Sequence, residues 1–338
     1  MSDPEEEVLE PELEIIDPHH HLWDYTMVPA DKAQDFYKHA PQYLLQEYLE
    51  DINTGHKITK TVFVQCFAMY SADESDPELR KVGETEFVNG IAAMSASGNY
   101  GPCRVAAAII GECDLRSDSA EEALKAHLST SSRFRGIRQM NFDPTGSIYG
   151  QPKFRENFAL MEKYGLVFET YQQTDHVYTV TDLARAFPNV TIVLNHLGGP
   201  IGPSRFDPNF DYKGPSGPPG PEREESWRDQ IKALAECPNV VVKLGGITMP
   251  LNGFELHKRE TPVGSEELAQ LLNPYMGFII DCFTPARCMF ETNFPVDKPS
   301  VSYKVLWNTY KRLAHLKGLT PEQKADIFSE TARRVYKL

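Results

Sequence analysis

The chain has 338 residues, of which 41% are hydrophobic and 24% are charged, and its formal net charge is −14 with a pI of about 5.2. This acidic balance argues against nucleic acid or an anionic membrane as a main partner, because both require a basic protein face. The length suits either two ordinary domains or one α/β barrel with insertions.

The N-terminal segment is the most acidic part of the chain. Seven of the first fourteen residues are Asp or Glu, and the segment has neither the basic nor the apolar region of a signal peptide. We therefore predict a solvated, disordered tail over residues 1–13 and a single domain over residues 14–338. Because no apolar run approaches the roughly 18 residues of a membrane span, we predict a cytoplasmic protein. The six cysteines show no C-x-x-C spacing, which favours reduced, mostly structural thiols.

Beyond this tail, apolar β-branched runs alternate with segments of helical period. Such alternation is typical of a parallel sheet whose strands are joined by crossover helices. The predicted strands cover residues 14–17, 61–65, 105–110, 134–138, 166–169, 191–195, 240–244 and 288–291. The predicted helices cover residues 43–52, 83–96, 120–128, 153–163, 180–186, 224–236, 265–283, 301–316 and 321–336. The last helix begins at Thr320 and Pro321, an N-cap followed by a first-turn proline.

Eight strands with intervening helices predict an α/β fold, a (β/α)₈ barrel of the TIM type. An open doubly wound sheet would carry a phosphate-binding glycine fingerprint after its first strand, and the sequence has none there. In a barrel the carboxyl ends of all the strands meet at one mouth, where catalytic residues are found. Polar residues that follow the predicted strands are therefore candidates for one shared site.

The first strand ends in Asp17-Pro18-His19-His20-His21-Leu22-Trp23. Side chains alternate along a strand, so His19 and His21 are expected to point the same way. Two imidazoles with this spacing can bind one divalent ion such as zinc. The alternative is a cluster of hydrogen-bonded core histidines, although burying three such polar groups requires dedicated partners. Trp23 is a candidate wall of the substrate pocket, with an ordinary core position as the alternative.

Two later strand ends supply further candidates for the same mouth. Asn195-His196-Leu197-Gly198-Gly199-Pro200 breaks the sixth strand and leaves His196 at its tip, where it could complete a three-histidine metal set with His19 and His21. The eighth strand is followed by three polar residues that could orient water or substrate, each with a structural role as the alternative: Glu291, Asn293 and Asp297.

Cations and an aromatic residue follow the remaining strands. Arg138 ends the fourth strand, and its planar bidentate guanidinium suits a substrate carboxylate. Lys243 lies in the seventh strand, where binding substrate and forming a salt bridge are equally reasonable roles. Tyr171 follows the fifth strand and is a candidate apolar wall.

Four motifs, at residues 17–24, 195–200, 242–246 and 290–297, resemble in order and spacing those of the amidohydrolase-2 family of the amidohydrolase superfamily. The resemblance extends from about Ile15 to the C-terminus. Characterised members are (β/α)₈ barrels, and many hydrolyse lactones of sugar acids or of aromatic-degradation intermediates, while other branches decarboxylate aromatic acids. The resemblance implies that His19, His21 and His196 are metal-binding or active-site histidines. It also implies that Arg138 lies where relatives hold substrate carboxylates.

The eighth-strand motif departs from the family's pattern. Many relatives carry an aspartate that binds metal or activates water at the position of Asn293. An amide cannot accept the proton of an attacking water, so Glu291, Asp297 or a histidine would have to do so, or the reaction uses no hydrolytic water. Some lactonases of this branch work without a tightly held metal, so the resemblance does not require one.

Three long segments between strands and helices are expected to cover the mouth. Residues 201–223 contain six prolines and four glycines, too many for regular structure, and residues 24–57 and 248–264 are further insertions. Loops in this position commonly act as lids or determine specificity. The alternative is that they form subunit contacts in a homo-oligomer.

Together these observations predict a hydrolase that opens a lactone, or a similar cyclic ester, of a small carboxylate-bearing molecule. Arg138 would hold the carboxylate, and the three histidines, with or without zinc or manganese, would polarise the carbonyl or position water. Asn293 would donate a hydrogen bond to the oxyanion, and Asp297 or Glu291 would transfer the proton. The alternatives are a lyase or isomerase on the same barrel and a non-catalytic binding protein, against which the clustered imidazoles argue.

Overall fold

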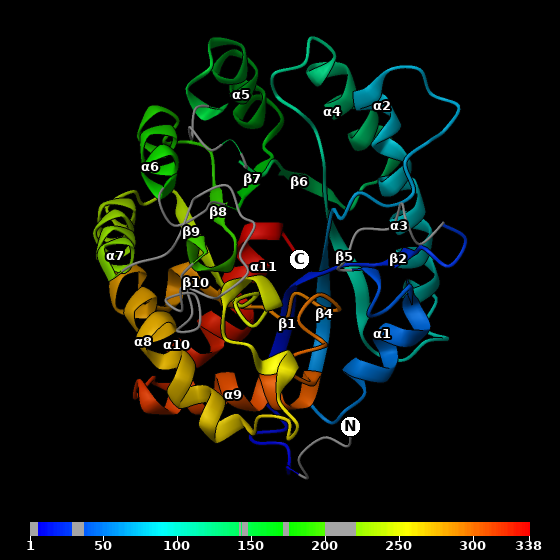
Figure 1. Ribbon diagram of the computed structural model, residues 1–338. Helices are drawn as coiled ribbons and strands as arrows, with labels where there is room; N and C mark the ends of the chain where they lie inside the picture. The colour runs from blue at the N-terminus through cyan, green and yellow to red at the C-terminus, as the bar shows by residue number, and fades with distance from the viewer. Residues whose placement is uncertain (1–5, 29–36, 142, 144–147, 172–175, 200–220) are drawn as a thin grey trace.

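The computed structural model describes residues 6–28, 37–141, 143, 148–171, 176–199 and 221–338 of the chain. Its centre is a sheet of eight parallel strands arranged as a barrel in chain order (Figure 1). All eight predicted strands are present, which confirms the (β/α)₈ fold. They are β1 (Glu14–His20), β4 (Lys57–Val64), β5 (Arg104–Gly111), β6 (Phe134–Arg138), β7 (Val167–Thr170), β8 (Ile192–Leu194), β9 (Val240–Leu244) and β10 (Cys288–Phe290).

The barrel closes between its first and last strands. The backbone N–H of His21 donates to the carbonyl of Phe294 at 2.8 Å, and that of Asn293 donates to the carbonyl of His19 at 2.9 Å. His20 and Phe294 form a parallel bridge at the same place. The first and last strands of the barrel are therefore joined at the mouth, next to the first histidine motif.

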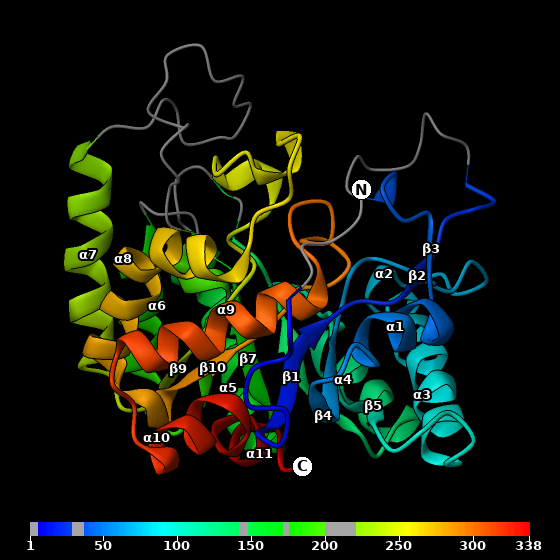
Figure 2. The same cartoon turned by 90° about the horizontal axis from the view of Figure 1, so that it is seen from below.

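Helices surround the strands on the outside of the barrel (Figures 1 and 2). They are α1 (Leu45–Ile52), α2 (Pro77–Arg80), α3 (Val82–Ala96), α4 (Ala120–Thr130), α5 (Pro152–Tyr164), α6 (Val177–Ala186), α7 (Pro221–Ala235), α8 (Ser265–Phe283) and α9 (Tyr303–Leu316). The short α2 was not predicted. The predicted C-terminal helix is divided into α10 (Pro321–Ala325), a π-helical turn (Asp326–Glu330) and α11 (Thr331–Tyr336). Its predicted start is confirmed, because Thr320 Oγ1 accepts from the backbone of Gln323.

The interior of the barrel is apolar at the end opposite the mouth. Valine, isoleucine, alanine and methionine side chains of β1, β4, β5, β7, β8, β9 and β10 form one buried cluster with Ala332, Val335 and Tyr336 of α11. Strands buried on both faces are expected to be rich in such residues, as the Val240–Leu244 strand is. Figure 2 shows α11 beneath the strands, on the side away from the loops of the mouth. The C-terminal helix thus closes the bottom of the barrel.

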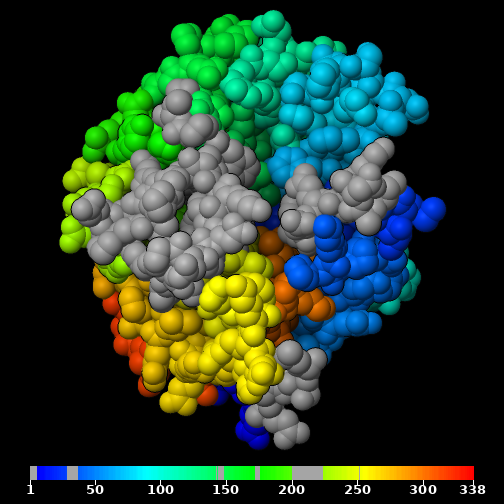
Figure 3. All heavy atoms as spheres, in the orientation of Figure 1, coloured from blue at the N-terminus to red at the C-terminus, as the bar shows by residue number. Residues whose placement is uncertain are grey.

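The described parts of the insertions after β1 and β9 lie on the mouth side of the barrel, the side that Figure 3 shows. The insertion after β1 contains an antiparallel pair, β2 (Trp23–Asp24) and β3 (Gln42–Tyr43), which was not predicted. The segment between β9 and α8 contains two 3₁₀ turns, Pro250–Asn252 and Leu256–Lys258. Of the predicted loop 201–223, residues 201–220 lie outside the described residues, and the last three begin α7.

The described part of the acidic N-terminal segment, residues 6–13, differs from the expected solvated tail. Glu6 Oε1 accepts from the backbone N–H of Ser265 at 2.7 Å, at the first residue of α8. The N–H of Leu9 donates to Asn308 Oδ1 at 2.9 Å, and Lys311 Nζ donates to the carbonyl of Leu9 at 2.7 Å. The physical reason is that a carboxylate satisfies the free N–H groups and the dipole at a helix start.

Two expectations from composition concern the whole chain. All six cysteines are free, five of them buried and Cys282 half-buried, as predicted for structural thiols. None of the helices that the structure describes combines the length and the apolar character needed to cross a membrane.

Candidate active site

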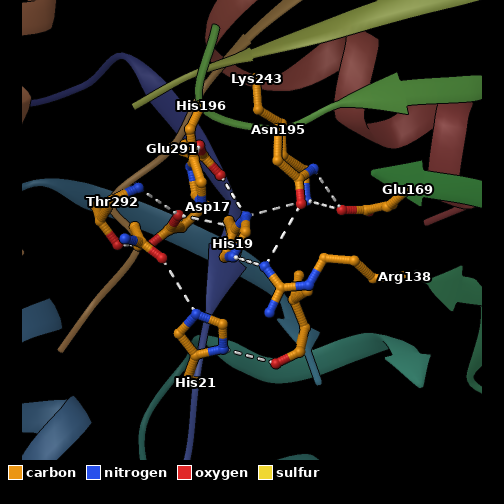
Figure 4. Close-up of polar contacts among 12 residues, drawn as sticks. Asp17, His19, His21, Arg138, Glu169, Asn195, His196, Lys243, Glu291 and Thr292 are labelled. Atoms are coloured by element: carbon orange, nitrogen blue, oxygen red, sulfur yellow. Dashed lines mark hydrogen bonds and ion pairs between the residues drawn. The ribbon is translucent and has the colours of Figure 1, made fainter. Parts of the chain in front are cut away.

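A buried polar cluster lies where the strands end at the mouth (Figure 4). Each of its side chains is at most 5% exposed, so each needs a partner inside the protein. The structure thus brings together side chains that the sequence placed far apart along the chain. The members of the cluster are His19, His21, Arg138, Glu169, Asn195, His196, Lys243 and Glu291.

Glu291 bridges His19 and His196. Its Oε1 lies 2.6 Å from Nδ1 of His196, and its Oε2 lies 2.5 Å from Nδ1 of His19. Among the described residues these three form the group whose ligand atoms all lie within 4.8 Å of one another. Two imidazoles and one carboxylate are the protein ligands of several catalytic zinc sites, which keep a further position open for water or substrate. The donor set therefore fits a divalent ion.

His21, expected as the third metal ligand, has other partners in the structure. Its Nδ1 lies 2.7 Å from the carbonyl oxygen of Val64, and its Nε2 lies 3.1 Å from Oδ1 of Asn293. The expected common direction of His19 and His21 is present, since their rings meet edge to face with centroids 4.9 Å apart. Within the described residues, however, Glu291 takes the third place in the cluster, because the carbonyl of Val64 and Asn293 occupy both ring nitrogens of His21.

The buried histidines are held in their neutral form. Burial lowers the pKa of His19 and of His196 well below 6.5, and nearby Lys243 and Arg138 act in the same direction. Burial also lowers the pKa of His21, to about 3. At neutral pH each of the three imidazoles therefore keeps one unprotonated nitrogen, the form that binds a metal ion or accepts a hydrogen bond.

Two cations face His19. Arg138 Nη1 lies 3.3 Å from Nε2 of His19, and Arg138 Nη2 donates to the carbonyl of Gln65 at 2.5 Å. Lys243 Nζ lies 3.5 Å from Nδ1 of His19. Because a guanidinium and an ammonium can only donate, Arg138 favours a lone pair on Nε2 of His19, whereas Lys243 favours one on Nδ1. Arg138 Nε has no hydrogen-bond partner among the described residues.

Glu169 links the cations to the end of β8. Its Oε2 accepts from Lys243 Nζ at 2.7 Å and from Asn195 Nδ2 at 2.8 Å. Asn195 Oδ1 in turn lies 3.5 Å from Arg138 Nη1. All of these groups are buried, and a buried ion pair is tolerated when further hydrogen bonds satisfy its atoms. Neither Glu169 nor Asn195 was predicted as a site residue from its sequence motif.

Asp297 lies behind Asn293. Asn293 Nδ2 donates to Asp297 Oδ2 at 2.6 Å, and the hydroxyl of Thr248 donates to Asp297 Oδ1. Burial raises the pKa of Asp297 to about 7. Asp297 thus holds the amide that contacts His21, and its own oxygens are already engaged.

Asp17 is a further buried carboxylate that ties β1 to the end of β10. It accepts from the backbone and hydroxyl of Thr292 at 3.1 and 2.6 Å, and from the hydroxyls of Tyr48 and Tyr303 at 3.0 and 3.1 Å. Thr292 is the neighbour of Glu291, so these bonds fix the bridging carboxylate from behind. The position of Asp17 at the start of the first motif indicated a polar role. Its partners could not be predicted, because Tyr48, Thr292 and Tyr303 are remote in sequence.

The glycine pair after β9 makes room for the bridge. A Cβ on Gly246 would lie 2.0 Å from Nδ1 of His196, and a Cβ on Gly245 would lie 2.2 Å from the carbonyl oxygen of Glu291. Gly246 also has a φ of +67°, a conformation that residues with a Cβ rarely adopt. The Val242–Gly246 motif therefore serves the site as well as the strand.

The two aromatic candidates differ in their surroundings. The ring of Tyr171 lies 5.5 Å from that of His196, and its side chain is half-buried, so it can border a ligand. Trp23 is fully buried, with its indole N–H donating to the carbonyl of Ala40 at 2.6 Å and its ring stacked 6.1 Å from that of His21. Trp23 therefore supports His21 from within the protein.

An eight-stranded parallel barrel with imidazoles, a carboxylate and cations at the carboxyl ends of its strands has the architecture of an amidohydrolase-type enzyme. The family model described as amidohydrolase matches residues 16–338, and the chain belongs to this family.

The curated proteins to which the chain is similar include an uncharacterized protein and a lactonase. It is 27% identical to the uncharacterized protein y4mH of Sinorhizobium fredii, over 97% of this chain and 99% of that protein. It is 24% identical to an L-fucono-1,5-lactonase of Burkholderia ambifaria, over 69% of this chain and 71% of that protein.

A solved structure has the same fold. An amidohydrolase of Burkholderia multivorans, determined with bound zinc, superposes with a TM-score of 0.70 at 22% identity and covers 96% of this chain and 99% of that one.

Proposed function

We propose that this protein hydrolyses a lactone, or a similar cyclic ester, of a small carboxylate-bearing molecule. The observation that carries the proposal is the Glu291 bridge between His19 and His196, with Arg138 and Lys243 beside it. The similarity to a lactonase supports the same reaction class. Membership of the amidohydrolase family supports hydrolysis at a barrel mouth.

In this proposal His19, His196 and Glu291 hold a divalent metal ion, zinc or manganese. Such an ion, when bound, polarises a carbonyl and lowers the pKa of water. The chain itself supplies neutral, buried imidazoles, whose lone pairs the pKa shifts keep available. His21 supports the site from the side through its contacts with His19 and Asn293.

The cations and the amide determine how the substrate is held. Arg138 has Nε without a hydrogen-bond partner among the described residues, and this donor suits the substrate's carboxylate. Asn293 is fixed by Asp297, and its amide N–H donates to charge that develops on the carbonyl oxygen. Lys243 adds positive charge, and Tyr171 borders the ring of the substrate beside His196.

A lyase on the same site is the second candidate, and the identity of residue 293 favours it. Asn293 cannot take a proton from water, and Asp297 is engaged with Asn293 and Thr248. Decarboxylation needs a metal or cations to hold the carboxylate but no attacking water, which the cluster also provides.

The test is a panel of carboxylated and neutral sugar lactones, L-fucono-1,5-lactone included, together with aromatic carboxylic acids, assayed in water enriched in oxygen-18. Hydrolysis incorporates one heavy oxygen into the product acid, whereas decarboxylation gives an aromatic product that has lost one carboxylate and carries no heavy oxygen. Turnover of a carboxylated lactone that falls about 100-fold or more in His196→Ala and in Glu291→Gln supports the proposal. Turnover of aromatic acids alone replaces it with the lyase.

Metal content separates the roles of the histidines. We expect about one equivalent of zinc or manganese in the purified wild type, and loss of that metal in His19→Ala and His196→Ala. His21→Ala is the matched control and should retain the metal, because its ring nitrogens face Val64 and Asn293. Retention of metal by His196→Ala, with loss from His21→Ala, would contradict the ligand assignment.

A further inference from the structure

A buried hydrogen bond connects the C-terminal helix to the candidate active site. Tyr336 is the last residue of α11 and is fully buried at the bottom of the barrel. Its hydroxyl donates to Oε1 of Glu169 at 2.6 Å. Glu169 belongs to the mouth cluster, so an element at one end of the barrel reaches the polar groups at the other.

The two oxygens of Glu169 have separate tasks. Oε1 takes the hydroxyl of Tyr336, whereas Oε2 takes Lys243 Nζ at 2.7 Å and Asn195 Nδ2 at 2.8 Å. Lys243 Nζ also lies 5.5 Å from the centre of the Tyr336 ring. The tyrosine therefore contacts both members of the ion pair, and the ring itself is held by the apolar cluster of the strands.

Loss of the hydroxyl would change the position of this carboxylate. Oε1 would become a buried carboxylate oxygen without a donor, an arrangement that carries a free-energy cost. Rotation of the carboxylate would relieve that cost by letting both oxygens share Lys243 and Asn195. Such a rotation draws Lys243 Nζ away from His19 and Asn195 away from Arg138, which are the contacts that orient the cations.

We propose that Tyr336 is a positioning residue: its hydroxyl fixes the Glu169 carboxylate so that Lys243 and Asn195 hold the cation geometry around His19. This inference rests on the proposed function for its kinetic readout. It gives α11 a task beyond closing the barrel, because a phenylalanine would fill the same space without holding the carboxylate.

The experiment compares Tyr336→Phe with the matched variant Tyr164→Phe. Tyr164, at the end of α5, also donates its hydroxyl to a carboxylate, Glu121 Oε1 at 2.6 Å, but it is only half-buried and belongs to the outer ring of helices. With the best lactone of the panel, we expect kcat of Tyr336→Phe to fall about tenfold with KM within about twofold, and Tyr164→Phe to match the wild type. Equal kcat values for both variants would overturn the proposal.

A double-mutant cycle with Glu169→Gln distinguishes positioning from general destabilisation. An amide in place of the carboxylate removes the charge, so the further change Tyr336→Phe should then lower kcat by less than about twofold. A full tenfold effect in that background would overturn the proposal. If Tyr336→Phe alone fails to fold, a tenfold loss of kcat on adding Tyr336→Phe to Glu169→Gln would still overturn the proposal.

Crystal structures of the wild type and Tyr336→Phe provide a readout that needs no substrate. We expect the Glu169 carboxylate to rotate and Lys243 Nζ to leave His19 in the variant. An unchanged Lys243 would overturn the inference whatever the reaction is. Failure of the wild type to turn over any lactone, with the expected displacement of Lys243, would remove the proposed function alone.

Discussion

Gly246 illustrates, at the scale of one residue, how the site depends on an absent side chain. The backbone there is left-handed, and the imidazole of His196 occupies the place that a Cβ would need. His196 itself has a φ of +52°, so its backbone is also strained. Neither Gly246 nor His196 can therefore shift without a cost in free energy. Room for the Glu291 bridge is therefore built into the backbone.

Gly246→Ala should abolish turnover, while Gly318→Ala should not. Both glycines have similar φ values, +67° and +61°, so both changes carry a backbone strain of about 1 kcal/mol. A Cβ on Gly318 meets no atom within 4 Å, whereas one on Gly246 displaces His196. We expect at least about a 100-fold loss of kcat/KM in Gly246→Ala alone. Similar activity in the two variants would show that His196 can move without penalty.

The residues of the site were predictable in part. His19 and His196 lie at the ends of strands, in motifs whose following residues end the strand. The structure places their rings together. The sequence offered three polar residues after β10 and could not rank them, because the choice of Glu291 depends on how β10 packs against Asp17 and Thr292. Tyr336 gave no signal, since an aromatic residue in an amphipathic helix normally indicates core.

At the scale of elements, the N-terminal segment stabilises α8 and α9 from outside the barrel. Besides capping α8, Glu6 accepts from the side chain of Asn308 in α9 at 3.0 Å. The segment therefore connects two helices that are neighbours in the outer ring. Through Glu6 the segment holds α8 and α9 together on the outside of the barrel.

Glu6→Ala should lower the melting temperature by about 1–3 °C, because a capping carboxylate contributes about 1 kcal/mol to a helix start. Glu12→Ala serves as the control. Its carboxylate is 90% exposed and pairs with Lys57 on the surface at 3.3 Å, a contact expected to contribute little. Differential scanning calorimetry measures both. Equal melting temperatures for the two variants would show that the Glu6 contact does not stabilise α8.

Element types were predicted better than the contacts of irregular segments. Every predicted strand is present, because short β-branched runs between turn residues favour strands that are buried on both faces. The β2–β3 pair and α2 were missed, since two-residue strands and a four-residue helix have no periodicity to detect. The N-terminal segment was misjudged from its charge, because its acids find a helix start and an asparagine that only the fold brings near.

At the scale of the whole molecule, buried titratable groups away from the site limit the pH range of stability. Burial raises the pKa of Glu84, in α3, to about 8 and lowers the pKa of His127, in α4, to about 4. Glu84 Oε1 accepts from the backbones of Cys66 and Ala68, whereas its Oε2 has no partner among the described residues. Both groups are therefore favoured in their neutral forms in the fold.

The sign of each contribution follows from proton binding. For Glu84 the folded state keeps its proton above the ordinary pKa of 4.5, so this stability is complete below pH 4.5 and is lost as pH rises through about 8. For His127 the folded state binds a proton only at a lower pH than the unfolded state does. Its contribution to stability is therefore complete above pH 6.5 and is lost as pH falls toward 4. The sum of these two contributions is therefore largest between about pH 4.5 and pH 6.5.

Glu84→Gln isolates the first contribution. Between pH 5 and pH 8 the free energy of unfolding of the wild type should fall by about 2–4 kcal/mol more than that of the variant, at about 1.4 kcal/mol per pKa unit. Glu86→Gln, on the exposed side of the same helix, should follow the wild type. Urea denaturation at each pH measures the three proteins. Parallel curves for wild type and Glu84→Gln would mean that Glu84 ionises without cost.

The bonds that close the barrel determine when this protein can begin to work. His19 and His21 pair with Asn293 and Phe294, so the opening and closing strands of the domain meet beside the bridging carboxylate. A ribosome must therefore release nearly the whole chain before the reactive groups can assemble. We therefore expect a chain that ends before β10 to lack the Glu291 bridge between His19 and His196, however well its completed portion has folded.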